Sequence, residues 1–136
     1  MEESEKKRIL VVDDDQELQN LIRVLLERVG FAVIPALTVG EAVRILRVKP
    51  LPDLVLLDLM LPDVSGMELL RQMRAKTFFD NLPVVILSAL ADADQIREGL
   101  ENGADRYLTK PYISHNLIKT VHEVLRTGRR KPSSES

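Results

Sequence analysis

The sequence contains no cysteine, which excludes disulfide bonds and thiolate metal sites. None of its apolar runs reaches the roughly 18 residues that a membrane-spanning helix needs, and the charged start MEESEKKR lacks the apolar core of a signal peptide. The formal net charge is only -2, so no large basic surface for nucleic acid is indicated. These absences predict a cytoplasmic domain that neither contacts a membrane nor binds nucleic acid directly.

The composition is that of an ordinary globular domain, with 45% hydrophobic and 29% charged residues among 136. This length fits one domain. We expect a disordered lead-in over residues 1–6 and the folded domain over residues 7–126. Residues 127–136, with the polar sequence TGRRKPSSES, are expected to form a solvated tail or a linker.

Short apolar runs alternate along the chain with segments of helical periodicity, such as Leu18 to Val29, where apolar residues recur three and four apart. Near-continuous apolar strands separated by amphipathic helices indicate an α/β fold, with a parallel sheet covered by helices on both faces. The predicted strands are Ile9–Val12, Phe31–Ile34, Leu54–Leu57, Val84–Leu87 and Tyr107–Leu108.

Residues that cap helices precede the periodic segments. Thr38 is followed three residues later by Glu41, and Asp92 by Gln95, which is the pattern of a capping box. Asp15, the third aspartate after the first predicted strand, is expected to cap the first helix rather than bind a ligand.

Polar residues follow four of the five predicted strands. In an open parallel sheet all carboxyl ends lie at one edge, and ligands bind just outside it. The second strand runs instead into Pro35, which suits a strand at the edge of the sheet. We therefore predict a doubly wound, flavodoxin-like sheet of order 2-1-3-4-5. The polar residues expected at its carboxyl edge are Asp13, Asp14, Asp58, Ser88, Thr109 and Lys110.

Three carboxylates in one place cannot all ionise cheaply without a counter-charge. Lys110 supplies one positive charge. Mg²⁺ suits the remainder, because it takes one or two carboxylates together with water and a phosphate. A carboxylate beside Mg²⁺, a lysine and the Ser88 hydroxyl is a place that can receive a phosphoryl group.

Four motifs, in this order, resemble the receiver domains of two-component response regulators: ILVVDDD, LVLLDLMLPDVSGMELL, PVVILSA and GADRYLTKPY. The resemblance covers about Lys7 to Arg126. It implies that a sensor histidine kinase or a phosphotransfer protein phosphorylates Asp58. It also implies that the face formed by the fourth helix, the fifth strand and the fifth helix then controls an output protein or effector domain, which the sequence does not identify.

The same resemblance implies individual roles. Lys110 and Ser88 would bind the phosphoryl group, and the ring of Tyr107 would turn inward when Ser88 moves. Met60 and Leu90 would flank the path of the hydrolytic water. The implied Mg²⁺ ligands are Asp13, Asp14, Asp58 and the backbone carbonyl of Met60. The implied turn residues after the acceptor are Pro62 and Gly66, and the implied cis peptide bond is Lys110-Pro111.

One position departs from the pattern of receivers that dimerise in front of winged-helix DNA-binding domains. They usually carry an acidic residue just before the switch tyrosine, where this chain has Arg106. The departure puts that charge-paired dimer in doubt, while a phosphorylation-dependent homodimer stays open. His115 and His122 are expected at the surface, and one of Phe78 and Phe79 in the core.

Three other functions are weighed against the receiver. A phosphatase of the haloacid-dehalogenase type would carry a second aspartate two residues after Asp58, where this chain has Met60. A pseudo-receiver that never takes phosphate is disfavoured by the intact polar set at the sheet edge. A flavodoxin-type FMN protein would have a phosphate loop rich in Ser, Thr and Gly where this chain has DDDQEL, which would repel phosphate.

Overall fold

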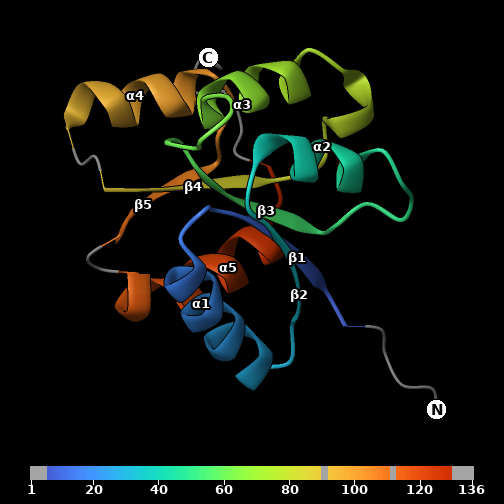
Figure 1. Cartoon of the computed structure of the whole chain (residues 1–136), viewed down its shortest axis with the longest axis vertical. Helices are drawn as coiled ribbons and strands as arrows, with labels where there is room; N and C mark the ends of the chain where they lie inside the picture. The colour runs from blue at the N-terminus through green and yellow to red at the C-terminus, as the bar shows by residue number, and fades with distance from the viewer. Residues whose placement is uncertain (1–5, 90–91, 111–112, 130–136) are drawn as a thin grey trace.

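The computed structural model describes residues 6–89, 92–110 and 113–129. Five parallel strands form one sheet in the order β2-β1-β3-β4-β5, which confirms the predicted topology (Figure 1). The strands are β1 (Arg8–Val12), β2 (Ala32–Ala36), β3 (Leu54–Asp58), β4 (Val84–Ser88) and β5 (Arg106–Thr109).

Helices cover both faces of this sheet, with α1 and α5 on one side and α2, α3 and α4 on the other (Figure 1). Side chains alternate between the faces along each strand. In β1, for example, Ile9 packs with the α1 and α5 side and Leu10 with the α2 and α3 side. The helices are α1 (Gln16–Arg28), α2 (Val39–Leu46), α3 (Gly66–Arg74), α4 (Ala93–Glu101) and α5 (Ile113–Thr127), with a short 3-10 helix, η1 (Thr77–Phe79).

The edge position of β2 agrees with its proline. Pro35 pairs in register with Val11 of β1, but the backbone groups of β2 that bond toward β1 belong to Ala32 and Ala36, so the backbone of Pro35 faces the open side of the strand. Proline has no backbone N–H, so it can lie in a strand only where that donor is not needed by a neighbour. The strand runs from Ala32 to Ala36, slightly later than predicted, and carries Pro35 inside it.

Predicted caps begin the first, second and fourth helices. The carboxylate of Asp15 accepts hydrogen bonds from the N–H groups of Glu17 and Leu18, which confirms its expected role. Thr38 accepts from the N–H of Glu41 at 3.0 Å, as a capping box requires. Glu41 returns the bond to the N–H of Leu37, one residue earlier than in the standard box. At α4, Asp92 accepts from the N–H of Asp94.

Not every apolar residue of the periodic segment from Leu18 to Val29 is buried. Leu21 and Val29 are each 44% exposed, whereas Gln19 is buried. The side-chain nitrogen of Gln19 lies 2.9–3.1 Å from the backbone carbonyl oxygens of Val11, Asp13 and Ala36. Buried backbone carbonyls need hydrogen-bond donors. Gln19 supplies them, and it is therefore buried although its side chain is polar.

At the amino ends of β4 and β5, the buried carboxylate of Asp105 joins several elements. It accepts from the N–H of Val84 and forms ion pairs with Arg74 at 3.4 Å and Arg129 at 2.8 Å. Arg129 also donates to the carbonyl oxygen of Asp80 at 2.7 Å. Within the stretch expected to be a solvated tail, Arg129 therefore lies against the domain. Burial, followed by repulsion from Arg129, lowers the pKa of Arg74 to about 10.

None of the helices within the described ranges has the length and apolar character needed to cross a membrane.

Replacing Asp105 by alanine would leave Arg74 without its buried carboxylate and the Val84 N–H without its acceptor. We expect the free energy of unfolding to fall by about 3–5 kcal/mol, the usual cost of removing one partner of a buried ion pair. The matched control is Arg23→Gln, which breaks an exposed pair with Glu27 and should cost less than about 1 kcal/mol. Urea unfolding measures both, and equal small losses would contradict the role given to Asp105.

Candidate functional site

The carboxyl ends of β1 and β3 bring two aspartates together. Val12 pairs with Leu57 in register, so Asp13, directly after β1, lies beside Asp58, the last residue of β3. Both carboxylates are buried. Asp14, which follows Asp13, is exposed. One carboxylate oxygen from each of the three aspartates lies within 4.8 Å of the other two, as the sequence predicts.

Lys110 brings a positive charge to this acidic cluster. Its Nζ lies 3.2 Å from Oδ2 of Asp13 and 3.3 Å from Oδ2 of Asp58. Burial is the largest single influence on the pKa of Lys110 and lowers it, but attraction to Asp13 and Asp58 together outweighs burial and raises that pKa. The ammonium group therefore stays charged and holds the two buried carboxylates together.

Asp13 lacks full compensation for its burial. Its Oδ1 accepts from the N–H of Asp15 at 2.9 Å, but its buried Oδ2 has no hydrogen-bond partner among the described residues. Oδ2 lies 3.2 Å from Nζ of Lys110, an ion pair that offsets part of its charge. Burial, reinforced by repulsion from Asp58, raises the pKa of Asp13. An additional cation at Oδ2 would remove this cost.

These residues fit a hard divalent cation. Carboxylate and carbonyl oxygens are the ligands that Mg²⁺ and Ca²⁺ use in proteins. The cluster offers three carboxylates, one of them exposed to solvent at Asp14 and one with an unsatisfied oxygen at Asp13. Lys110 offsets only part of the negative charge, so the donor set can hold a metal ion.

The loop after β3 is closed by Gly66, the first residue of α3. A Cβ atom on Gly66 would lie 2.0 Å from the carbonyl oxygen of Asp58, which no other residue could tolerate without moving the backbone. The N–H of Gly66 donates to the carbonyl oxygen of Leu59 at 2.9 Å. The N–H of Met60 in turn donates to Oδ1 of Asp58 at 3.2 Å. The glycine therefore lets α3 start directly against the backbone of Asp58.

The other residues predicted for the site lie at this edge or next to it. Ser88, the last residue of β4, is fully buried, and it pairs in register with Thr109, which precedes Lys110. Tyr107 on β5 is half-buried and packs against the core below α4. Met60 is 65% exposed beside Asp58. Leu90 and the Lys110-Pro111 peptide bond lie outside the described residues.

Sequence reasoning missed two residues that shape the site. Gln19 binds the backbone carbonyl of Asp13 and so fixes the end of β1. In the sequence, Gln19 is only a polar residue beside the apolar stripe of a predicted helix. Such residues are common on protein surfaces, so the pattern does not mark Gln19 as buried. Asp63, in the loop after β3, accepts from the N–H groups of Val39 and Gly40 at the start of α2. These two bonds hold its pKa below the ordinary value, the bond from Gly40 contributing most.

The side chains expected to lie outside the site do so. His115 and His122 are exposed on α5, and the ring of His122 contacts Phe31. Phe79 packs against the core, whereas Phe78 is 53% exposed.

Comparison with known proteins identifies relatives along most of the chain. The sequence model of the response regulator receiver domain matches residues 9–122. The chain is 42% identical to the DNA-binding response regulator MtrA of Mycolicibacterium smegmatis, over 94% of this chain and 54% of that protein. It is 38% identical to the phosphate regulon transcriptional regulatory protein PhoB of Pseudomonas aeruginosa, over 88% of this chain and 52% of that protein. The chain thus spans about half the length of these relatives.

A solved structure shows the same fold. The receiver domain of the Francisella response regulator 1452 superposes with a TM-score of 0.82 and 33% sequence identity, covering 89% of this chain and 98% of that one. The sheet order and the flanking helices described above are therefore those of a known receiver domain.

The raised pKa of Asp13 makes a prediction about stability in metal-free buffer. Because the folded state holds the Asp13 proton more strongly than the unfolded state, the contribution of Asp13 is most favourable below pH 3.8 and is lost as pH rises through the raised pKa. At pH 7 only the cost of the buried charge remains.

Asp13→Asn should therefore raise the free energy of unfolding at pH 7 by on the order of 1 kcal/mol, since the amide keeps an acceptor for the Asp15 N–H. The gain should shrink as the pH approaches 3.8. Urea unfolding in the presence of a chelator measures both. A variant that is less stable than the parent at pH 7 would show that the Asp13 charge is already fully compensated.

Proposed function

The chain belongs to the response regulator receiver domain family, and we propose that it is the switch of a two-component system, phosphorylated on Asp58. The observation that carries the proposal is the Asp58 carboxylate, which lies beside the Lys110 ammonium and the other two aspartates. Phosphorylation-dependent switching is the general function of the family. A sensor histidine kinase or a phosphotransfer protein is the donor.

In the transfer step, a carboxylate oxygen of Asp58 attacks the phosphorus of a phosphohistidine. The new P–O bond forms as the P–N bond breaks, and the imidazole leaves. No general base is needed, because the nucleophile carries no proton to remove. Lys110, now 3.3 Å from Oδ2 of Asp58, stabilises the charge on the incoming phosphoryl oxygens.

Mg²⁺ is the cation that fits this chemistry, because it shares its coordination between few carboxylates, waters and phosphate oxygens. When bound, it neutralises charge that builds up on the phosphoryl group. The unsatisfied oxygen of Asp13 supports this assignment. The proposed ligands are Asp13, Asp14, Asp58 and the backbone carbonyl of Met60.

The switch follows from what the phosphoryl group attracts. Ser88 donates its hydroxyl to a phosphoryl oxygen, Lys110 binds another, and Tyr107 repacks as β4 and β5 adjust. The close packing of α4 on β5 supports this route. A Cβ atom on Gly99 of α4 would lie 2.6 Å from the side chain of Ile86 on β4 and 3.6 Å from the ring of Tyr107 on β5, so α4 packs directly over both strands at this position. The α4-β5-α5 face is the output surface.

The output surface carries an ion pair within one chain. Arg106 of β5 lies 3.8 Å from Glu123 of α5, both partly exposed. An arginine that already faces a carboxylate of its own chain is poorly placed to reproduce a dimer that needs an acidic residue there. A phosphorylation-dependent homodimer would therefore use other contacts on this face.

Partners and place in the cell are part of the same proposal. MtrA is named a DNA-binding regulator and PhoB a transcriptional one. The receiver domain, proposed as residues 7–126, corresponds to about half of each relative. It passes a signal to an output protein or effector domain and does not itself contact nucleic acid or membrane. Residues 1–6 and 127–136 flank it. A receiver of this kind works in the cytoplasm.

The domain is not an enzyme for other substrates and takes part only in its own phosphorylation and dephosphorylation. A phosphatase acting on small substrates would need an acid at the second position after Asp58, and that position is Met60, largely exposed. A pseudo-receiver would have no use for a partly buried lysine held between two buried aspartates.

Intact mass spectrometry after incubation with Mg²⁺ and acetyl phosphate tests the phosphoacceptor. The parent chain should gain the mass of one phosphoryl group, and Asp58→Asn should gain none, because an amide is not a nucleophile for this reaction. Asp15→Asn is the matched control: it removes one carboxylate next to the site but keeps the helix cap, so the adduct should form. Steady hydrolysis of phosphate esters would favour the phosphatase, and absence of any adduct the pseudo-receiver.

The metal site is tested by thermal unfolding with and without Mg²⁺. A ligand that binds only the folded state raises the free energy of unfolding, by about 2.7 kcal/mol at 100 times its dissociation constant, and therefore raises the midpoint temperature. We expect this rise for the parent and for Asp15→Asn, and its loss for Asp13→Asn and Asp14→Asn. An equal rise in all four proteins would place the metal elsewhere.

A further inference from the structure

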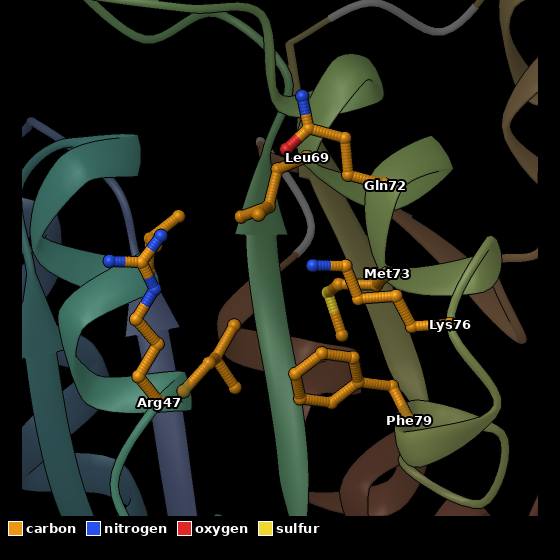
Figure 2. A pocket seen from close by; sticks show the side chains of 8 residues that line it. Arg47, Leu69, Gln72, Met73, Lys76 and Phe79 are labelled. Atoms are coloured by element: carbon orange, nitrogen blue, oxygen red, sulfur yellow. The ribbon is translucent and has the colours of Figure 1, made fainter.

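Two hollows flank the C-terminal half of α2, far from the acidic cluster. The first lies between α2 and α3 and has about 100 Å³ of free volume (Figure 2). Leu69, Met73 and Phe79 make its apolar floor, while Arg47 and Lys76 stand at its rim from opposite sides. The hollow therefore combines an apolar interior with two cations at the mouth.

The second hollow, on the other side of α2, repeats this composition. Ile34, Ile45 and Val48 provide the apolar lining, and Arg44 and Lys49 the positive charge. Val48 is 65% exposed, the same fraction as Met60 beside Asp58. We call the two hollows together, with the last turn of α2 between them, the α2 surface.

The cations of the α2 surface have no acidic partner. The side chains of Arg44, Arg47 and Lys76 form no ion pair or hydrogen bond with any described residue, and the side chain of Lys49 has only the ring of Phe78 at 5.7 Å. By contrast, Arg23, Arg71 and Arg106 each face a carboxylate. Four unneutralised cations gather here in a chain whose net charge is -2.

We propose that the α2 surface docks an acidic polypeptide segment that inserts apolar side chains into the two hollows. The first hollow, with about 100 Å³, is too small for a drug-sized ligand and suits one apolar side chain, and the second has about 330 Å³, at the lower end of the range of small-molecule sites. Buried apolar anchors surrounded by complementary charge are the usual composition of a binding hot spot. Nucleic acid would match the charge, but the aliphatic substituent of its bases, the methyl group of thymine, is much smaller than a leucine side chain.

The position of the α2 surface makes the binding independent of the proposed switch. α2 covers the β2 and β1 end of the sheet, whereas β5 is the opposite edge (Figure 1). A segment bound across α2 leaves the α4-β5-α5 face and the acidic cluster open. The inference therefore stands even if phosphorylation of Asp58 fails.

The test follows backbone amide signals by NMR during titration with a synthetic peptide of glutamates that carries two leucines. Shifts are expected over residues 43–49 and 72–79, with a dissociation constant below about 1 mM. Arg47→Glu combined with Lys76→Glu should weaken binding at least about tenfold, which corresponds to 1.4 kcal/mol. Arg28→Glu, an exposed cation on α1, is the matched control and should bind as the parent does.

Three outcomes would overturn the proposal. In the first, no shift appears on the α2 surface up to about 1 mM peptide. In the second, a peptide with serines in place of the leucines binds equally well, which would mean unspecific charge attraction. In the third, a short DNA duplex binds the same residues more tightly than the peptide. Each variant's thermal unfolding is measured alongside, and charge reversal at these exposed positions should leave it close to the parent's.

Discussion

The ammonium group of Lys110, held between the buried carboxylates of Asp13 and Asp58, is the interaction on which the site depends. Without this ammonium group, the carboxylates of Asp13 and Asp58 would repel each other at the ends of adjacent strands. Burial would add the cost of removing each charge from water. One lysine does not balance three aspartates. The residual imbalance, visible in the raised pKa of Asp13 and its unsatisfied oxygen, is what makes the site receptive to a metal cation.

The rest of the fold keeps this arrangement in place. The order of the sheet sets β1 beside β3, and Asp13 and Asp58 are buried at the ends of these apolar strands. Gly66 lets α3 begin against the backbone of Asp58, and Gln19 holds the carbonyl of Asp13. At the other edge of the sheet, Asp105 with Arg74 and Arg129 ties β4, β5 and the end of α5 together. The charge of Asp105 is thus neutralised within the fold, whereas the charge of the three aspartates at the carboxyl edge is neutralised only in part.

The sequence predicts the strand order and the gathering of Asp13, Asp14, Asp58 and Lys110 because both depend on local patterns. Apolar runs define strands, and the rule that parallel strands end at one edge brings their terminal residues together. It does not predict Gln19 or Arg129, because each donates to backbone carbonyls outside its own element, and many polar side chains could do so. The helical period also does not tell which apolar residues of this segment are buried, since Leu21 and Val29 fit the period but are 44% exposed.

The most direct test of a cation among these aspartates is a crystal of the protein soaked with Mn²⁺, which substitutes for Mg²⁺ and scatters anomalously. The account predicts one strong anomalous peak contacted by carboxylate oxygens of Asp13 and Asp58, with Lys110 still beside them. Asp13 and Asp58 carboxylates that point apart, or a map with no peak between them while Mn²⁺ is present in excess, would contradict it.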